Sequence, residues 1–423
     1  MHVNKRVLKF GAVALAGAFA LSACGGSEPA ATNSEPADPG SLETTIKILA
    51  PSYSDSSQAD WQAIIDKFNE TYPDVDVELQ IEGWDGFTDK VSARIQAGDY
   101  PDILNDNAFA ASADAGILYP MDEVLSADTL AAIEPSLLAN GVGTDGTQWA
   151  APDIASARMM AYNVDLFEAA GIAEPPKTWA ELETAAEKLV ALGDDVRGYG
   201  MPLGREEAQV ESSLWLWGAG GDWADGEGLK ADTPEATEAF AQMKKMYEAG
   251  YTQANLEDNR VDIADLFQAG KLGMMMAHSA IVADAEAKGV NVALAPIPAK
   301  DGGDGVALGV TDFIVAFDNG DADRKAATSA FLDLMYSDEM YEGWYKGTGL
   351  LPVTTSMIDK GKAESDENGA AFLEALSIVK FLPVGNPAWD VLQTALQGSA
   401  YKVGSGDPAE VLAEIQAQVD AQS

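Results

Sequence analysis

The sequence predicts an α/β protein with two lobes. Near the start of the chain, apolar residues alternate between the two-residue period of strands and the 3.6-residue period of helices. This βαβα order is typical of a parallel sheet with helices on both sides. At 423 residues the chain is also too long to enclose one hydrophobic core, so we expect two lobes.

The first elements follow from periodicity and from the turns between them. A parallel sheet places ligands beyond the carboxyl ends of its strands, so the loops after these strands are candidate binding loops. The predicted elements are a strand over 46–49, a helix with Trp61, Ile64, Ile65 and Phe68 on one face, a strand over 75–81, a helix with Phe87, Val91 and Ile95 on one face, and a strand over 101–104.

A second set of signals lies in the middle of the chain. A short helix over 164–170 should end at Gly171, and the two prolines that follow exclude helix there. Thr178 stands three residues before Glu181, the spacing of a capping box that starts a new helix. Asp407 and Pro408 likewise predict the start of a final helix.

Several segments resemble a known family. Residues 162–172 read Tyr-Asn-x-Asp-Leu-Phe-x-x-Ala-Gly-Ile, and 175–182 read Pro-Pro-x-Thr-Trp-x-Glu-Leu. Both resemble the extracellular solute-binding proteins of bacterial ABC importers, in the sugar-binding family that includes maltose-binding protein. Further segments resemble that family in the expected order, namely 98–103, 145–152, 267–274, 326–334 and 347–352.

The resemblance implies a periplasmic-binding-protein-like fold. Each of its two lobes would have a central sheet flanked by helices, and several crossings of the chain would form the hinge. Lobe one would comprise 42–153 and 311–354, and lobe two 154–310 and 355–423. The predicted crossings are near 153, at the return around Thr311, and in the segment 349–352.

The N-terminus predicts a targeting segment over 1–23. Basic residues precede an apolar stretch over 10–21 that is too short to anchor stably across a bilayer. The stretch ends in Leu-Ser-Ala-Cys24, which resembles a bacterial lipobox, so we expect a lipid on Cys24. An ordinary secretory signal with a chance cysteine is the alternative. Residues 24–41 are rich in Gly, Ser, Pro and Ala and predict a flexible linker.

Charge and cysteine content exclude several classes of partner. The chain has 26 Lys and Arg residues against 68 Asp and Glu residues, and this balance would repel nucleic acid and anionic head groups. Cys24 is the one cysteine in the sequence, so no disulfide or thiolate metal site can form within the chain.

Catalytic motifs are also lacking. His2 lies in the targeting segment, which leaves His278 as the one histidine of the processed chain and excludes a histidine-based zinc site. The Gly-x-Ser-x-Gly elbow of serine hydrolases does not occur. A glycosidase needs a carboxylate pair, but 68 acidic residues make such a pair uninformative. We therefore predict a binding protein without metal or cofactor.

The chain contains nine tryptophans, and four of them are candidates for stacking on a sugar. Trp84 lies in a polar turn after a strand, and the resemblance places an aromatic ring on the sugar at Trp389. Trp215 and Trp217 are two residues apart and cannot share a helical face, so we expect at least one in the cleft. Core packing remains the alternative for each.

Polar contacts are carried over from the family by position, with three departures. Ser156 replaces a glutamate, Gln393 an arginine, and His278 lies where Gly-x-Trp is common. A buried histidine with satisfied hydrogen bonds is the alternative for His278. The candidate ligand contacts are Tyr53, Asp55, Trp84, Asn105, Asp106, Ser156, Trp215, Trp217, His278, Thr311, Asp312, Trp389 and Gln393.

The resemblance thus implies a monomeric, lipid-anchored receptor outside the cytoplasmic membrane. It would bind a saccharide between its lobes and deliver it to ABC permease subunits. A non-sugar solute such as glycerol phosphate is the first alternative, and it would require clustered Arg or Lys in the cleft. An extracellular carbohydrate-processing enzyme is the second.

Overall fold

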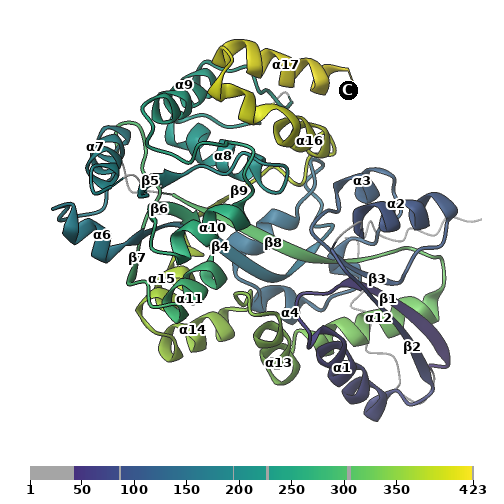
Figure 1. The fold of residues 1–423 in the computed structure, drawn as a ribbon. Helices are drawn as coiled ribbons and strands as arrows, with labels where there is room; N and C mark the ends of the chain where they lie inside the picture. The colour runs from purple at the N-terminus through teal and green to yellow at the C-terminus, as the bar shows by residue number, and fades with distance from the viewer. Residues whose placement is uncertain (1–41, 85–86, 194, 225–227, 303–305, 422–423) are drawn as a thin grey trace, which may run out of the picture. The chain divides into compact units, whose positions relative to one another are not determined.

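The computed structural model describes residues 42–84, 87–193, 195–224, 228–302 and 306–421, which form a mixed α/β structure (Figure 1). The strands are β1 (Thr44–Pro51), β2 (Val75–Glu82), β3 (Ile103–Asp106), β4 (Ala151–Asn163), β5 (Arg197–Gly200), β6 (Leu272–Ala277), β7 (Val292–Ala295), β8 (Ala307–Ala316) and β9 (Val379–Phe381).

Helices separate most of these strands along the chain. The α-helices are α1 (Ser57–Thr71), α2 (Phe87–Ala97), α3 (Ala110–Asp114), α4 (Ala127–Ala132), α5 (Pro135–Leu138), α6 (Val164–Ala169), α7 (Trp179–Val190), α8 (Ala208–Gly218), α9 (Pro234–Glu248), α10 (Arg260–Gln268), α11 (Ser279–Ala287), α12 (Ala322–Met335), α13 (Asp338–Thr348), α14 (Thr355–Glu364), α15 (Glu367–Ala375), α16 (Trp389–Ser399) and α17 (Pro408–Asp420). Short 3₁₀ turns are η2 (Met121–Glu123), η3 (Ala139–Gly141) and η4 (Ala400–Gly404).

The first half of the structure is built on β2, β1, β3 and the end of β8. Strands β2 and β3 pair parallel to β1, and β8 pairs antiparallel to β3 through residues 313–316. Helices α1 and α12 pack against this group. Helix α1 buries Trp61, Ile64, Ile65 and Phe68, which confirms the predicted apolar face.

The second half contains β5, β6, β7 and the end of β4. Strand β4 lies between β6 and β7 over residues 159–163, and both neighbours run antiparallel to it. Helices α7, α10, α11 and α15 contact these strands. Helices α8, α9, α16 and α17 form a further packed group, seen at the top of Figure 1.

Two long strands join the halves. Strand β4 pairs antiparallel with β8 from Ala151 opposite Ile314 to Arg158 opposite Leu308. The sheet order is therefore β2-β1-β3-β8-β4-β6-β5, with β7 on β4 and β9 on β8. In the first half, the parallel pairing expected from the βαβα order holds for β1, β2 and β3, and β8 then joins β3 running the opposite way. Parallel pairs also form between β5 and β6 and between β8 and β9.

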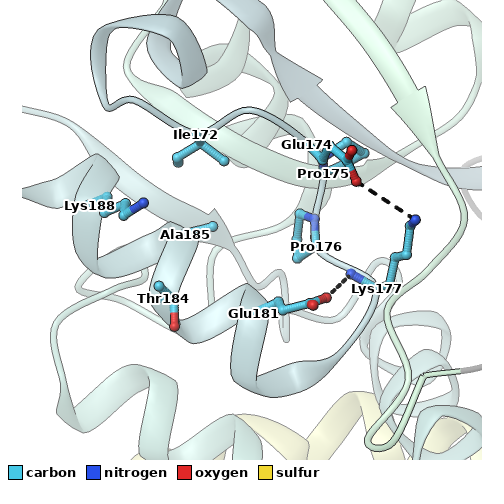
Figure 2. Close-up of a pocket in the computed structure, with 9 residues that line it drawn as sticks. All are labelled: Ile172, Glu174, Pro175, Pro176, Lys177, Glu181, Thr184, Ala185 and Lys188. Atoms are coloured by element: carbon cyan, nitrogen blue, oxygen red, sulfur yellow. Dashed lines mark hydrogen bonds and ion pairs between the residues drawn. The ribbon is translucent and has the colours of Figure 1, made fainter.

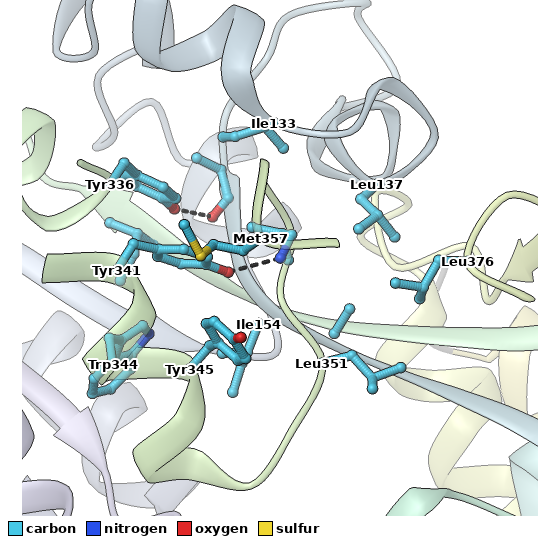
Figure 3. Close-up of a cluster of buried hydrophobic side chains, with 14 of the residues drawn as sticks. Ile133, Leu137, Ile154, Tyr336, Tyr341, Trp344, Tyr345, Leu351, Met357 and Leu376 are labelled. Carbon is cyan, nitrogen blue, oxygen red and sulfur yellow. Dashed lines mark hydrogen bonds between the residues drawn. The ribbon is translucent and has the colours of Figure 1, made fainter. Parts of the chain in front are cut away.

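The β4–β8 ladder contains a bulge at Asp153, where the register shifts between Pro152 and Ile154. Backbone carbonyls at a bulge lack ladder partners, and the hydroxyl groups of two tyrosines labelled in Figure 3 bind them here. Tyr336 Oη donates to the Pro152 carbonyl at 2.9 Å, and Tyr341 Oη donates to the Asp153 carbonyl at 2.6 Å. These tyrosines belong to a buried apolar cluster drawn from both halves.

The local signals in the middle of the chain are confirmed. Thr178 and Glu181 form the predicted capping box at the start of α7. Gly171, with φ of +65°, follows the short helix α6. The side chain of Asp407 accepts hydrogen bonds from two backbone amides at the start of α17.

The targeting segment, Cys24 and the linker over 24–41 lie outside the described residues. Within the described part of the chain, no helix has the length and apolar character needed to cross a bilayer.

Replacing Tyr341 with Phe tests whether its hydroxyl group stabilises the bulge. Its hydroxyl also accepts from the Val353 amide at 2.8 Å, so Tyr341→Phe leaves two buried backbone groups unpaired. We expect a loss of about 1–3 kcal/mol in the free energy of unfolding, measured by urea denaturation. Tyr345→Phe is the matched control, because no described residue hydrogen-bonds that neighbouring hydroxyl. Equal stability of both variants would contradict this role.

Candidate functional site

The ends of β1 and β3 bring Tyr53 and Asn105 together. Tyr53 Oη donates to Asn105 Oδ1 at 3.1 Å, and Asn105 Nδ2 donates to the carbonyl of Phe313 at 3.1 Å. The ring of Trp84 stands edge-on to Tyr53, with 5.7 Å between the ring centroids. This arrangement fixes an aromatic and a polar group at one edge of the first half.

Three carboxyl groups converge near this edge from different elements. They are Asp106 at the end of β3, Asp312 on β8 and Asp390 in the first turn of α16. Burial, with smaller contributions from Asp312 and Asp390, raises the pKa of Asp106 to about 7. Burial also raises the pKa of Asp312 to about 6, and it raises the pKa of Asp390. Near neutral pH the carboxyl group of Asp106 is therefore partly protonated, so it can donate as well as accept hydrogen bonds.

An ion-pair network in the second half includes Arg158, a residue of β4. Arg158 Nη2 lies 2.8 Å from Glu207 Oε1, and Arg260 Nε lies 3.1 Å from Glu207 Oε2. Arg260 Nη2 also pairs with Glu206 Oε1 at 2.8 Å, and Arg158 Nη1 donates to Ser156 Oγ at 3.0 Å. Burial opposes ionisation of Glu207, but the two arginine charges outweigh it and lower the pKa.

His278 adjoins this network at the start of α11. Burial and the charges of Arg158 and Arg260 lower the pKa of its imidazole to about 2, so the ring is neutral. Its Nδ1 atom is buried without a hydrogen-bond partner among the described residues. A ligand contact at His278 stays a prediction.

The structure gives the candidate tryptophans different surroundings. Trp84 is 38% exposed, whereas Trp389 is 2% exposed and donates from Nε1 to Gln393 Oε1 at 3.0 Å. Trp215 is buried and donates to Glu211 at 2.8 Å. Trp217 is buried beneath Lys380, whose Nζ lies 5.1 Å from the ring centroid. Of these rings, Trp84 has the largest exposed fraction.

The remaining candidates divide between the β4–β8 crossing and its surroundings. Thr311 is buried in the crossing and accepts from Asn140 Nδ2 at 2.7 Å, whereas Asp55 is exposed on the loop after β1. The residues that the structure brings together around the crossing are Tyr53, Asn105, Asp106, Ser156, His278, Thr311 and Asp312. Trp215 and Trp217 lie instead in the core of the second half.

Sequence reasoning missed Arg158, Glu207, Arg260 and Asp390. A signal existed for Arg158, since it is the one charge in the run Ala-Arg-Met-Met of a buried strand. A buried charge must be paired, so that position predicts a nearby acid. Glu207 and Asp390 lie in or next to the first turns of helices, where acidic residues are common for local reasons, and Arg260 is a single basic residue at the start of α10 with no local pattern around it.

The described residues offer no metal-ligand cluster, and one groove lies away from the predicted contacts. No group of three or more His, Cys, Asp or Glu side chains in the described ranges could hold a metal ion. A groove of about 280 Å³ lies between the loop after α6 and helix α7, lined by Ile172, Pro175, Pro176 and polar neighbours (Figure 2). None of the predicted contacts lines that groove, and its Glu181 carboxylate accepts from the Lys177 amide at 2.8 Å.

The chain is similar to known binding proteins over most of its length. Residues 63–371 match the family described as bacterial extracellular solute-binding protein. A binding protein of Brucella abortus is 30% identical over 386 residues, which cover 89% of this chain and 92% of that protein. The diacetylchitobiose-binding protein DasA of Streptomyces coelicolor is 25% identical, covering 86% of this chain and 84% of that protein.

A solved structure shares the fold. The cyclic alpha-maltosyl-1,6-maltose binding protein from Arthrobacter globiformis matches with a TM-score of 0.74 and 21% identity, covering 89% of this chain and 98% of that one. The predicted architecture of periplasmic binding proteins is thereby confirmed.

The raised pKa of Asp106 predicts a pH-dependent stability. An unfolded aspartate has a pKa near 4, so the native state binds this proton more tightly than the unfolded state. The stabilising contribution is complete below about pH 4 and is lost as the pH rises through about 7. Asp106→Asn removes this dependence.

Urea denaturation at pH 5 and pH 8 measures the effect. Relative to wild type, Asp106→Asn should be more stable at pH 8 than at pH 5 by about 2 kcal/mol. Asp55→Asn alters an exposed carboxylate on the loop after β1 and should follow the wild-type pH profile. Parallel profiles for wild type and Asp106→Asn would show that Asp106 is already ionised at pH 5.

Proposed function

Because the chain belongs to the family of bacterial extracellular solute-binding proteins, we propose that it captures a saccharide and delivers it to the permease of an ABC importer. One observation carries the choice of ligand: an exposed indole at Trp84 lies beside Tyr53, close to buried carboxyl groups. Sugars offer apolar C–H faces to aromatic rings and hydroxyl groups to carboxyl oxygens. The protein acts as a monomeric binding protein and not as an enzyme.

The two halves act as lobes that hold the ligand between them. Lobe one is 42–153 with 311–354, and lobe two is 154–310 with 355–423. Packing of α12 on β1 and α1, and of α15 on β4 and α11, supports these boundaries. The third crossing is supported by Leu351 and Ala155, whose backbone groups exchange hydrogen bonds of 2.8 and 2.9 Å.

Charge argues against an anionic solute such as glycerol phosphate. Arg158 and Arg260 are the cations of the network, and Glu206 and Glu207 already pair with them. The carboxyl group of Asp312 lies close to Arg158 and would add repulsion when ionised. A neutral ligand avoids this cost.

Calorimetry tests the proposed ligand class. Purified protein would be titrated with maltose, cellobiose, laminaribiose, N,N′-diacetylchitobiose and glycerol 3-phosphate, and each mixture would be checked for turnover. We expect saturable binding of at least one saccharide with no product formed. Binding of glycerol 3-phosphate alone, or hydrolysis of a saccharide, would overturn the proposal.

Truncating Trp84 should weaken binding more than folding. Trp84→Ala removes an exposed ring face, and we expect a loss of affinity of about 10- to 100-fold with a nearly unchanged melting temperature. Trp179→Ala is the matched control, because that ring is buried and its loss should cost several kcal/mol of stability at unchanged affinity. The reverse pattern for Trp84→Ala would assign its ring to the core.

Trp389→Ala decides the stacking role that the family resemblance gave this residue. Weaker sugar binding with normal melting would support it. Early melting with normal binding would instead agree with the buried environment of the ring.

The Leu-Ser-Ala-Cys24 sequence supports a lipid anchor on the outer face of the membrane. In cells that export the full chain, Cys24→Ser should move the protein from the membrane fraction into the surrounding medium or periplasm. Fractionation followed by immunoblotting measures the shift, with the wild-type chain as control. Continued membrane retention of Cys24→Ser would refute lipidation at this residue.

A further inference from the structure

Three buried nitrogen atoms near the β4–β8 crossing have no hydrogen-bond partner among the described residues. They are Nε of Arg158, Nη1 of Arg260 and Nδ1 of His278. A buried polar atom without a partner is destabilising, and most such atoms in native proteins have one. The two guanidinium N–H groups need an acceptor, and Nδ1 of the neutral imidazole needs a donor or an acceptor according to its tautomer. The group therefore indicates a missing polar partner at this place.

Strand pairing and ion pairs bring the three side chains together. Strands β4 and β6 run antiparallel with Met159 opposite Ala277, so the next step along the ladder places Arg158 opposite His278. Arg260 joins them through Glu207, which pairs with both guanidinium groups. Arg158 is 6% exposed, whereas the side chain of Arg260 is 16% exposed and His278 is half-buried.

Charge selects the kind of acceptor that fits. The two guanidinium charges are matched by Glu206 and Glu207, and the imidazole is neutral. An added anion would leave a net negative charge beside Asp312 in a medium of low dielectric constant. A neutral oxygen atom, from a hydroxyl or a carbonyl group, satisfies the nitrogen atoms without that cost.

We propose that the side chains of Arg158, Arg260 and His278 form hydrogen bonds with uncharged oxygen atoms of the bound saccharide. These contacts would select neutral sugars over sugar acids and sugar phosphates. This inference rests on the proposed function. These nitrogen atoms are shielded from solvent in the structure, so the proposal requires the side chains around them to rearrange when the ligand binds. Hydroxyl and carbonyl oxygens both form such hydrogen bonds, and a comparison of ligands with and without an N-acetyl group distinguishes the two.

Substitutions at His278 test the contact. His278→Ala removes Nδ1 and should lower the affinity for the best-binding neutral disaccharide about 5- to 30-fold. His278→Asn places an amide group near the position of Nδ1 and should recover part of the loss. His278→Gln places its amide near the position of Nε2 and should not. Melting temperatures of all variants would be measured alongside.

A matched ligand series tests selectivity. The best neutral disaccharide, its uronic acid derivative and its N-acetylated derivative would be titrated into wild type and His278→Ala. The uronic acid should bind wild type at least tenfold more weakly than the neutral sugar. A larger effect of His278→Ala on the N-acetylated sugar would assign the contact to a carbonyl oxygen, and an equal effect would assign it to a hydroxyl.

The failures of the two proposals are distinguishable. If wild type binds no saccharide, the proposed function fails. If wild type binds a saccharide and His278→Ala binds it equally well, ordered water alone satisfies these nitrogen atoms and the inference is overturned. Binding of the uronic acid as tightly as the neutral sugar would also overturn it.

Discussion

The antiparallel pairing of β4 with β8 is the constraint on which the rest of the structure depends. It is the ladder through which the sheet of the first half continues into that of the second. The bulge at Asp153 interrupts this ladder, and Tyr336 and Tyr341 bind the carbonyl groups that it leaves unpaired. The polar site is arranged around the same crossing, since Asp312 and Ser156 lie on its two strands. The geometry of this crossing therefore also fixes the position of the candidate site.

Buried polar groups at this crossing are of two kinds. Asn105 and Glu207 have partners that hold them in place, whereas Asp153 has two carboxyl oxygens with no partner among the described residues. Burial, followed by the charge of Asp312, raises the pKa of Asp153 well above its ordinary value. A neutral carboxyl group at the bulge avoids the cost of a buried charge. Buried groups around the crossing are therefore held by hydrogen bonds and ion pairs, and Asp153 avoids a buried charge by staying neutral.

Local features of the fold could be predicted from the sequence because their physical causes are local. The face of α1 follows from the spacing of Trp61 and Phe68, and the start of α7 follows from Thr178 and Glu181. The antiparallel place of β8 depends on pairing across more than 150 residues, which no local pattern records. Tyr53 and Asp312 could be named because the family resemblance supplied their positions. The ion pair of Arg158 with Glu207 was missed because it joins residues 49 apart in the sequence. Burial of Trp389 likewise depends on packing from distant elements.

The exposure of Trp84 has a spectroscopic consequence. All nine tryptophans lie within the described residues, and among them Trp84 alone is more than a third exposed. An indole in contact with water emits at longer wavelength than one enclosed by apolar side chains. Light collected at the long-wavelength side of the emission band would therefore come more from Trp84, at the candidate site, than from the rings in the core. The native chain carries its own optical reporter at that position, without any attached dye.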